Sequence, residues 1–449
     1  MNVTLLDRYG GAVPRYTSYP TAPHFHDGID GAVYADWLRT LPADTVLSLY
    51  FHVPFCRKMC WYCGCHTKVV NRTEPIAEYA GYLKREVELI TAIAGRGRPV
   101  SHVHWGGGTP SILADSDFTA IMASVKDAFR LTDDAEVAIE IDPRTVSREQ
   151  AQVLAAAGVN RASLGIQDFN PDIQEAINRV QSYEQTAEVV GWLRDAGIDA
   201  INFDLMCGLP GQVESDVVRT VDLSMKLRPD RLSIFGYAHV PWMKTHQKQI
   251  DDEALPDGPE RMRQALATSE RLVEHGYRRI GLDHFARPED SMAEMLDDGD
   301  LHRNFQGYTT DAAQALIGFG ASAIGSLAQG YVQNAPSIRQ YKRMIEAGEP
   351  PIVKGIELDD EDRMRRELIE RLMCDMEVDL GEVAGHYGHT GAVFAAERTR
   401  LADMQTDGIV QLEGDGITVT EDGRPFVRTV CAVFDSYLST GRGRHSRAV

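Results

Sequence analysis

Short apolar runs alternate with longer amphipathic stretches through the first 280 residues of the chain. The runs are typical of β-strands, whereas the stretches between them repeat apolar residues at helical spacing. Predicted strands cover residues 47–53, 100–105, 136–141, 162–166, 200–205 and 231–235, and predicted helices cover 76–93, 118–129, 148–157, 183–196 and 215–227. Strand followed by helix, six times over, predicts an α/β fold with a parallel sheet.

Polar residues recur where these strands end, which is where the active sites of barrels lie. A doubly wound sheet would also suit this order of elements, but the polar strand ends favour a partial barrel of the (β/α)6 type. A seventh strand at residues 278–282 closes the region. We therefore predict an N-terminal arm at 1–40, a barrel domain at 41–283 and a barrel extension and connecting region at 284–355. The arm either lies on the surface or folds over the site.

The pattern changes after residue 356 to long helices at 361–373 and 393–407, followed by a hairpin at 408–420. This order predicts a smaller, mostly helical, winged-helix-like domain at 356–449. Modules of this shape often bind DNA, but the net charge of -20 argues against nucleic acid and anionic membranes as partners. The charge favours a packing or lid role for the domain.

Composition places the protein among globular chains of the cytoplasm. It has 43% hydrophobic and 25% charged residues, no apolar run of membrane-spanning length and no signal peptide at its start. Cysteine thiols stay reduced in the cytoplasm, so clustered cysteines there indicate a metal or redox site.

Four of the seven cysteines fall within residues 56–65. Cys56, Cys60 and Cys63 have the spacing Cx3Cx2C, which puts three thiolates on one loop. Structural zinc normally takes four protein ligands, whereas three suit a cubane iron–sulfur cluster with one iron open to another ligand. Zinc and a redox thiol group remain alternatives, and Cys65 either completes a set of four or lies beside the cluster.

The later strand ends carry further candidates. Three glycines at 106–108 allow a ligand to approach the backbone closely, although a tight turn explains them as well. Strand alternation puts Glu140 on the face opposite Ile139 and Ile141, where an acid needs a partner. The other strand-end candidates are Gln167, Arg179, Asn202, Asp204, Ala238 and His239.

Several motifs together resemble those of the radical S-adenosylmethionine enzymes. They are the Cx3Cx2C loop, GGGTP at 106–110, IEIDP at 139–143 and GIQ at 165–167. The resemblance is closer still to the oxygen-independent coproporphyrinogen III oxidase (coproporphyrinogen dehydrogenase) family. It rests on RYTSYPTA at 15–22, CWYCGC at 60–65, SLGIQDFN at 163–170, INFDLMCGLPGQ at 201–212, DHFARPED at 283–290 and HRNFQGYTT at 302–310.

The resemblance implies a [4Fe-4S] cluster on Cys56, Cys60 and Cys63 and two molecules of S-adenosyl-L-methionine. The positions that match the first molecule's site are Tyr50, Gly107, Glu140 and Ile324. Those for the second are Tyr62, Gly108, Thr109, Gln167, Arg179, Asp204 and Ala238. Tyr62 stands where the family often has Phe, and His66 stands where Asn is expected.

The resemblance also implies the reaction. A 5′-deoxyadenosyl radical from reductive cleavage of S-adenosylmethionine would start the decarboxylation of two propionates of coproporphyrinogen III to vinyl groups, giving protoporphyrinogen IX in haem biosynthesis. A low-potential donor such as flavodoxin or ferredoxin would supply the electron, and the enzyme would be a monomer. Arg15, Lys68 and Arg303 are candidates for binding the four propionates.

Three other functions compete with this one. A haem chaperone on the same scaffold shares the cysteine loop and the GGGTP turn, but it usually lacks a cysteine at position 65, the RYTSYP arm and the HRNFQGYTT motif. A zinc-stabilised scaffold that binds nucleic acid and a radical enzyme acting on RNA are both disfavoured by the net charge.

Overall fold

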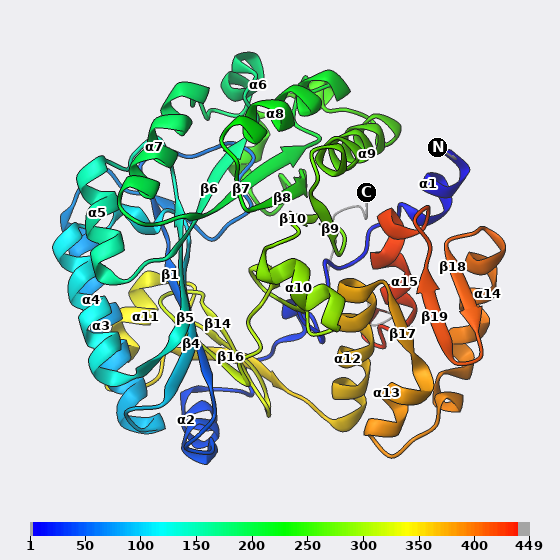
Figure 1. The fold of residues 1–449 in the computed structure, drawn as a ribbon. Coiled ribbons are helices and arrows are strands. Elements are labelled where there is room, and N and C mark those ends of the chain that lie inside the picture. The colour runs from blue at the N-terminus through cyan, green and yellow to red at the C-terminus, as the bar shows by residue number, and fades with distance from the viewer. Residues whose placement is uncertain (1–2, 439–449) are drawn as a thin grey trace.

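The computed structural model describes residues 3–438, and six parallel strands form the centre of the fold (Figure 1). They are β1 (Leu47–Val53), β4 (Pro99–Gly107), β5 (Arg130–Ile141), β6 (Arg161–Gln167), β7 (Ala200–Cys207) and β8 (Arg231–Gly236), adjacent in that order. Each predicted strand is present, so the expected six-unit partial barrel is confirmed.

Helices follow the strands and cover the outer face of the sheet (Figure 1). They are α3 (Glu74–Ala94), α4 (Asp115–Ala128), α5 (Arg148–Ala157), α6 (Pro171–Ala176), α7 (Tyr183–Asp195), α8 (Glu214–Lys226) and α9 (Gly258–Glu274). Local sequence fixes their ends. In α5 the Ser147 side chain accepts a hydrogen bond from the Gln150 amide at the start, and Gly158, with φ of 106°, ends the helix.

Residues beyond 278 extend the sheet at both edges, giving twelve strands in the order β16-β15-β14-β13-β1-β4-β5-β6-β7-β8-β10-β9. The added strands are β9 (Arg278–Ile280), β10 (His284–Ala286), β13 (Ala315–Phe319), β14 (Ile324–Leu327), β15 (Gly330–Asn334) and β16 (Ile352–Glu357). The predicted seventh strand exists as β9, but it does not follow β8 in a barrel. It lies antiparallel to β10, which itself pairs antiparallel with β8, and so forms the sheet edge.

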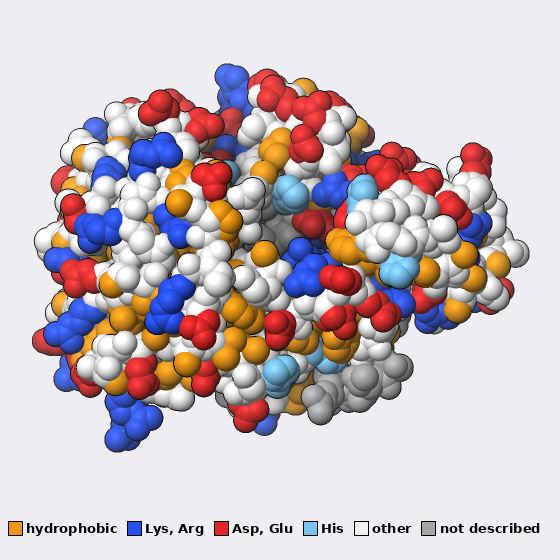
Figure 2. Space-filling model, turned by 90° about the horizontal axis from the view of Figure 1, so that it is seen from below, with side chains coloured by type: hydrophobic (Ala, Val, Ile, Leu, Met, Phe, Trp, Pro, Cys, Tyr) orange, Lys and Arg blue, Asp and Glu red, His pale blue; other side chains and the backbone are white. Residues whose placement is uncertain are grey.

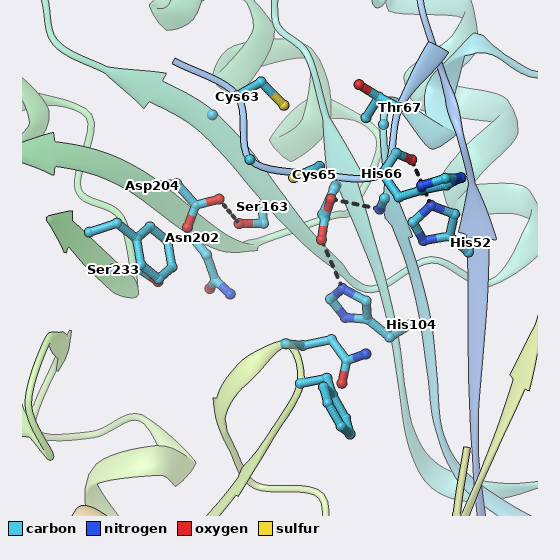
Figure 3. A pocket seen from close by; sticks show the side chains of 18 of the residues that line it. His52, Cys63, Cys65, His66, Thr67, His104, Ser163, Asn202, Asp204 and Ser233 are labelled. Carbon is cyan, nitrogen blue, oxygen red and sulfur yellow. Dashed lines mark hydrogen bonds and ion pairs between the residues drawn. The ribbon is translucent and has the colours of Figure 1, made fainter. Parts of the chain in front are cut away.

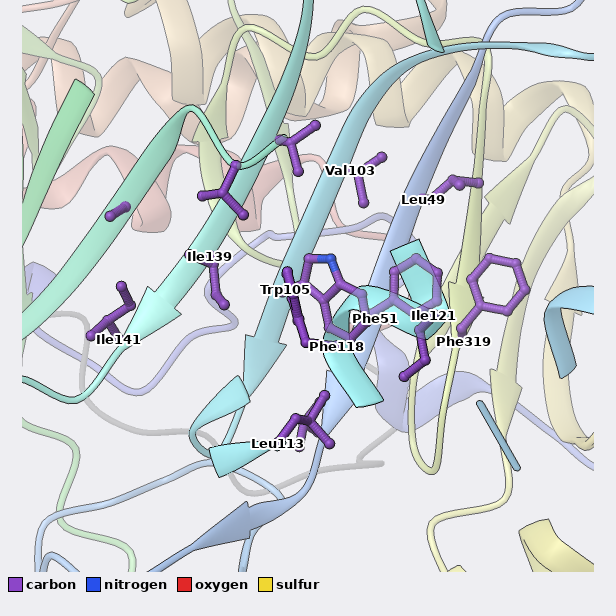
Figure 4. Packing of buried hydrophobic residues seen from close by; sticks show 14 of the residues in the cluster. Leu49, Phe51, Val103, Trp105, Leu113, Phe118, Ile121, Ile139, Ile141 and Phe319 are labelled. Atoms are coloured by element: carbon purple, nitrogen blue, oxygen red, sulfur yellow. The ribbon is translucent and has the colours of Figure 1, made fainter. Parts of the chain in front are cut away.

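The two faces of the central strands differ, because successive side chains point to opposite sides. Outward-facing side chains form the main hydrophobic core beneath the helices (Figure 4). In the core Phe51 stacks between Trp105 and Phe319, with ring centroids 4.3 and 4.8 Å apart, as the registers of β4 and β13 against β1 require. The inward-facing side chains, by contrast, are mostly polar.

The C-terminal part is helical with one small sheet. Its elements are α12 (Asp360–Asp375), β17 (Glu377–Asp379), α13 (Leu380–His386), η5 (Gly391–Phe394), α14 (Ala395–Thr406), β18 (Val410–Glu413), β19 (Gly416–Val419), η6 (Arg424–Phe426) and α15 (Val427–Val433). Strands β17, β19 and β18 form a three-stranded antiparallel sheet that includes the predicted hairpin.

The N-terminal segment packs against this C-terminal part. It contains α1 (Val3–Tyr9), η1 (Ala22–His24) and α2 (Gly31–Thr40). Tyr9, Tyr16 and Tyr19 are buried in the hydrophobic cluster of the C-terminal helices. The arm is therefore an integral part of the fold rather than a loose surface extension.

Short elements complete the chain. They are β2 (Phe55–Cys56), β3 (Lys68–Val69), η2 (Pro110–Ile112), η3 (Thr245–Gln249), η4 (Asp252–Ala254), α10 (Ser291–Asp298), β11 (His302–Asn304), β12 (Gly307–Thr309) and α11 (Ile338–Glu346). Within residues 3–438, every helix is too short or too polar to cross a membrane. On the face drawn in Figure 2, acidic and basic side chains are interspersed, without the continuous basic surface that nucleic-acid binding uses.

Candidate active site

The inner face of the partial barrel encloses a cavity of about 880 Å³. All fourteen residues that the sequence singles out for cofactors line it, namely Tyr50, Cys56, Cys60, Tyr62, Cys63, Gly107, Gly108, Thr109, Glu140, Gln167, Arg179, Asp204, Ala238 and Ile324. Cys63 and Asp204 of this set are drawn in Figure 3, together with Cys65 and His104, which also line the cavity. Residues up to 274 positions apart in sequence thus meet in one chamber at the strand ends.

Backbone hydrogen bonds hold the cysteine loop over this cavity. The loop leaves β1 through β2 and returns through β3, which pairs parallel with β2. Trp61 N donates to Ile177 O (3.0 Å), and the Asn178 side chain donates to Met59 O (2.7 Å), so the loop is fastened to the segment after β6.

The segment after β8 holds the other side of the loop. Gln247 Nε2 donates to Tyr62 O (2.9 Å), Lys244 Nζ donates to Cys65 O (2.8 Å), and His246 Nε2 lies 2.7 Å from Cys63 O. Three residues of one short segment therefore satisfy loop carbonyls that would otherwise lack partners.

The sulfur atoms of the loop receive hydrogen bonds from three side chains. Thr109 Oγ1 donates to Cys56 Sγ, and Arg144 Nη2 and Arg179 Nη1 both donate to Cys60 Sγ, each over 3.5 Å. A hydrogen bond from Cys65 lowers the pKa of the Cys63 thiol to about 6, against the effect of burial. The thiolate is the form that binds metal.

The three cysteines of the Cx3Cx2C motif are available as ligands of a metal centre. In the part of the chain that the structure describes, no three His, Cys, Asp or Glu side chains are already gathered as a site for one metal ion. The three loop cysteines face one cavity and are all free thiols.

Glu140 is positioned as strand alternation predicts. Ile139 and Ile141 are buried in the core, whereas the Glu140 carboxyl faces the cavity. Its Oε2 accepts a hydrogen bond from Gly107 N (3.1 Å), and its Oε1 lies 3.4 Å from His104 Nε2. The acid is therefore partnered at the edge of the glycine turn.

In the glycine turn the backbone lies very close to neighbouring residues. A Cβ on Gly107, whose φ is 110°, would lie 2.6 Å from a carbon of the His52 ring, and one on Gly108 would lie 2.6 Å from Phe55 O. Gly108 N and Thr109 N donate to Val53 O and Phe55 O, both over 2.9 Å, so the turn lies directly against the start of the cysteine loop. Only glycine fits at these two positions.

Asp142, Arg144 and Arg179 form a cluster of charged side chains beside Cys60. Burial alone would raise the pKa of the Asp142 carboxyl, but Arg179 and Arg144 lower it to about 2. Arg179 Nη2 also donates to Gly165 O (2.6 Å), and its Nε is buried without a partner in the described residues. On the neighbouring strand, burial raises the pKa of Asp204 to about 6, and Ser163 Oγ donates to its Oδ2 (3.1 Å).

Ion pairs close the floor of the cavity. Arg161 Nε lies 2.7 Å from Glu136 Oε2, and Arg231 Nε lies 2.7 Å from Asp290 Oδ1. Burial opposes ionisation of Glu136, yet Arg161 and Arg231 lower its pKa to about 2. This network fills the end of the barrel opposite the cysteine loop.

Sequence reasoning did not identify every residue of the site, and Arg144 is one that it missed. The fourteen residues that it did name all line the same cavity. Arg144 follows β5 directly after IEIDP, so its position at a strand end was the available signal. Among the three predicted substrate cations, Arg15 lines the cavity and Arg303 lines an adjoining one. Lys68 lies on β3 with an exposed side chain and lines neither of these two cavities.

Comparison with known proteins decides the family. The radical SAM superfamily matches residues 50–224, and the HemN C-terminal domain matches residues 358–426. The oxygen-independent coproporphyrinogen III oxidase of Bradyrhizobium diazoefficiens is 51% identical over the full length of both chains. The chain belongs to the oxygen-independent coproporphyrinogen III oxidase family.

Further relatives agree with this assignment. The oxidase of Paracoccus denitrificans is 41% identical over 99% of this chain and 98% of its own length. The solved coproporphyrinogen III oxidase of Escherichia coli, described as a radical SAM enzyme, has a TM-score of 0.91 at 35% identity and covers 97% of this chain and 99% of its own. Family membership makes the protein an oxidoreductase of porphyrin biosynthesis and implies a [4Fe-4S] cluster and S-adenosylmethionine.

Proposed function

We propose that the protein decarboxylates two propionate side chains of coproporphyrinogen III to vinyl groups, giving protoporphyrinogen IX without oxygen. The observation that carries this proposal is the full-length identity of 51% to an oxidase of that name. The gathering of the cofactor candidates around one cavity supports it. Each propionate would lose a hydrogen atom, CO2 and one electron, the electron passing to an external acceptor.

Cys56, Cys60 and Cys63 would hold the cluster in this proposal. Tyr50, Gly107, Glu140 and Ile324 would bind one S-adenosylmethionine, and Tyr62, Gly108, Thr109, Gln167, Arg179, Asp204 and Ala238 would bind a second. The placement of two acids supports separate sites for two S-adenosylmethionine molecules. Glu140 lies against the glycine turn, whereas Asp204 lies on another strand beside Ser163. When bound, these groups supply one-electron cleavage of a sulfonium, which yields a carbon radical able to remove a hydrogen atom.

The chain's own residues would tune and protect this chemistry. The N–H groups of Arg144 and Arg179 stabilise negative charge on the Cys60 sulfur, and hydrogen bonds to ligand sulfurs are one of the terms that set a cluster's potential. The ion pairs of the floor fill the end of the barrel and exclude water from that side. Glu140, held by Gly107 N, offers an acceptor at a fixed position.

The electron would come from an acidic low-potential carrier such as flavodoxin or ferredoxin, acting on a cytoplasmic monomer. Residues 45–73 contain no Asp or Glu, although the chain has 66 of them, and they include Arg57, Lys58, Lys68 and Arg72. The side chains of Lys58, Lys68 and Arg72 are exposed. A basic surface around the cysteine loop of an acidic protein would steer an acidic partner to that point.

Anaerobic incubation with reduced flavodoxin or dithionite, S-adenosylmethionine and coproporphyrinogen III tests the proposal. We expect a product with two vinyl groups and iron and sulfide in cluster proportion. Haem capture without vinyl product would instead favour the chaperone function, and stoichiometric zinc without iron would favour a zinc scaffold.

A further inference from the structure

The short helix η3, in the segment after β8, contains one glutamine whose side chain is fully buried. This residue is Gln247, whereas its neighbours Thr245, Lys248 and Gln249 on the same short helix are exposed. A side-chain amide is costly to bury unless its N–H and C=O groups find hydrogen-bond partners. The partners of Gln247 therefore show which parts of the molecule it holds together.

The Gln247 amide bridges the cysteine loop and the end of β8. Its Nε2 donates to Tyr62 O on the loop (2.9 Å) and to Ala238 O after β8 (3.2 Å). Its Oε1 accepts a hydrogen bond from Val240 N (2.6 Å). A side-chain NH2 group has two hydrogens to donate, so both are used on these two carbonyls. One amide thus joins two segments that are far apart in the sequence.

The two carbonyls belong to residues of the same predicted cofactor position. Tyr62 and Ala238 both line the cavity beneath the cysteine loop. Ala238 also lines the adjoining cavity of about 1350 Å³, so it lies on the wall between the two chambers. The separation of the two backbones across this part of the cavity is therefore set by the Gln247 amide.

Apolar packing supports both ends of this bridge. A small hydrophobic cluster includes Ile250, directly after η3, and Tyr237, directly before Ala238. Tyr62 packs against the same cluster. The polar contacts of Gln247 and the apolar contacts of this cluster therefore act on the same two segments.

The cysteine loop has other fastenings that do not involve Gln247. Trp61 N donates to Ile177 O, Met59 O accepts from Asn178, and Cys65 O accepts from Lys244. Loss of the Gln247 amide should therefore leave the three cysteines of the motif in place. Its effect should be confined to the relative position of Tyr62 and the end of β8.

We propose that Gln247 is a positioning residue for the second S-adenosylmethionine, because it holds Tyr62 and Ala238 at the separation that this molecule requires. The inference rests on the proposed function, which assigns both residues to that molecule. Gln247 lines neither of the two cavities, so it acts through the two backbone groups that it binds. Without its N–H groups, two buried carbonyls lose their donor and the two segments are free to separate.

Equilibrium dialysis with S-adenosylmethionine tests the inference on the anaerobically reconstituted full chain, with the cluster oxidised so that no cleavage occurs. The wild type should bind two molecules per chain. Gln247→Met keeps the volume but removes the donors, so it should bind one molecule with wild-type affinity and the other about tenfold or more weakly. Iron content and the absorption spectrum should match those of the wild type.

Two further variants separate hydrogen bonding from packing. Gln247→Glu has nearly the same size and keeps the acceptor for Val240 N, but it offers no N–H to the two carbonyls. It should show the same selective loss as Gln247→Met, whereas a residue needed only to fill space would tolerate both changes. Gln249→Met is the matched control, since it is the same substitution at an exposed position of the same short helix, and it should bind both molecules normally.

Several results would overturn the inference. One is wild-type affinity for both molecules in Gln247→Met and Gln247→Glu, and another is loss of iron or of both molecules together, which would make Gln247 a support of the loop itself. If Gln247→Met does not fold, Gln247→Glu decides alone. A wild type that binds a single molecule would remove the second cofactor of the proposed function and the inference with it. A wild type that binds two molecules but forms no vinyl product would remove only the proposed reaction.

Discussion

A buried carboxylate on α3 controls the turn that leads to one of the proposed cofactor positions. Glu86 is fully buried, and its Oε2 accepts hydrogen bonds from Gly320 N (2.7 Å) and Tyr341 Oη (2.6 Å). Its Oε1 accepts one from Asn334 Nδ2 (2.7 Å). Gly320 follows β13, and the chain returns from there to Ile324 on the cavity wall. Loss of these bonds should therefore loosen the turn.

The perturbation is Tyr341→Phe, which removes one donor from the carboxylate. Burial raises the pKa of Glu86 to about 7, and the three hydrogen bonds limit the rise. Because the folded pKa lies above the ordinary value of 4.5, the folded state loses stability as pH rises from about 4.5 to 7. Above that window Glu86 is ionised, and its bond to Tyr341 is worth about 1.5–3 kcal/mol, compared with about 0.5–1.5 kcal/mol for a neutral bond.

Hydrogen exchange of the peptide that contains residues 316–325 measures this local stability. At pH 8 the variant should exchange about 10- to 150-fold faster than the wild type at the same pH, and at pH 5 less than about tenfold faster. Tyr82→Phe is the control, since Tyr82 lies on the same helix and its hydroxyl donates to the exposed Glu346. Equal acceleration at both pH values, or in the control, would refute the role given to Glu86.

Three further predictions concern the cysteine loop. Arg144→Gln removes an N–H donor from a ligand sulfur, so the cluster potential should fall by on the order of tens of millivolts in a redox titration followed by electron paramagnetic resonance, and an unchanged potential would contradict the proposed tuning. Lys58→Glu should slow cluster reduction by acidic flavodoxin several-fold at low ionic strength but not reduction by dithionite, whereas Lys226→Glu on α8 should change neither. Gly107→Ala should cut activity by about tenfold or more through the clash with His52, and wild-type rates in that variant would show that the turn can move.

Local patterns made most of the barrel predictable. The apolar runs of β1 and β4 to β8 are bounded by clear helices, and each predicted strand lies within about two residues of the observed one, apart from the earlier start of β5 at Arg130. The cofactor candidates could be found because parallel strands end at one edge of a sheet, so residues after successive strands meet. Motif resemblance then selected among the polar strand ends.

The sheet edges could not be predicted in the same way. Strands β13 to β15 and most of β16 lie in the region assigned only as a barrel extension and connecting region. Their pattern was not predicted, because β13 pairs with β1 across 268 residues and the strands β14 to β16 that continue the sheet from it are short. The predicted strand at 278–282 exists as β9, but its antiparallel pairing with β10 could not be predicted, since a strand's own residues do not specify its neighbour. Arg428 carried no local signal either, because it reaches the adjoining cavity only through the packing of α15 on the arm.

The distribution of charge ties these features together. A net charge of -20 predicts repulsion of an anionic substrate and of an acidic electron carrier alike. The chain meets both requirements locally, with an acid-free segment around the cysteine loop and with Arg303, whose Nε and Nη1 atoms are buried, in the adjoining cavity. These two positive regions differ in burial, so they should differ in their response to salt. Exposed cations such as Lys58 are screened at physiological ionic strength, whereas buried guanidinium groups are screened much less. Raising the salt concentration should therefore weaken reduction by the carrier before it weakens binding of the porphyrin, and the reverse order would mean that the substrate charges are met at the surface instead.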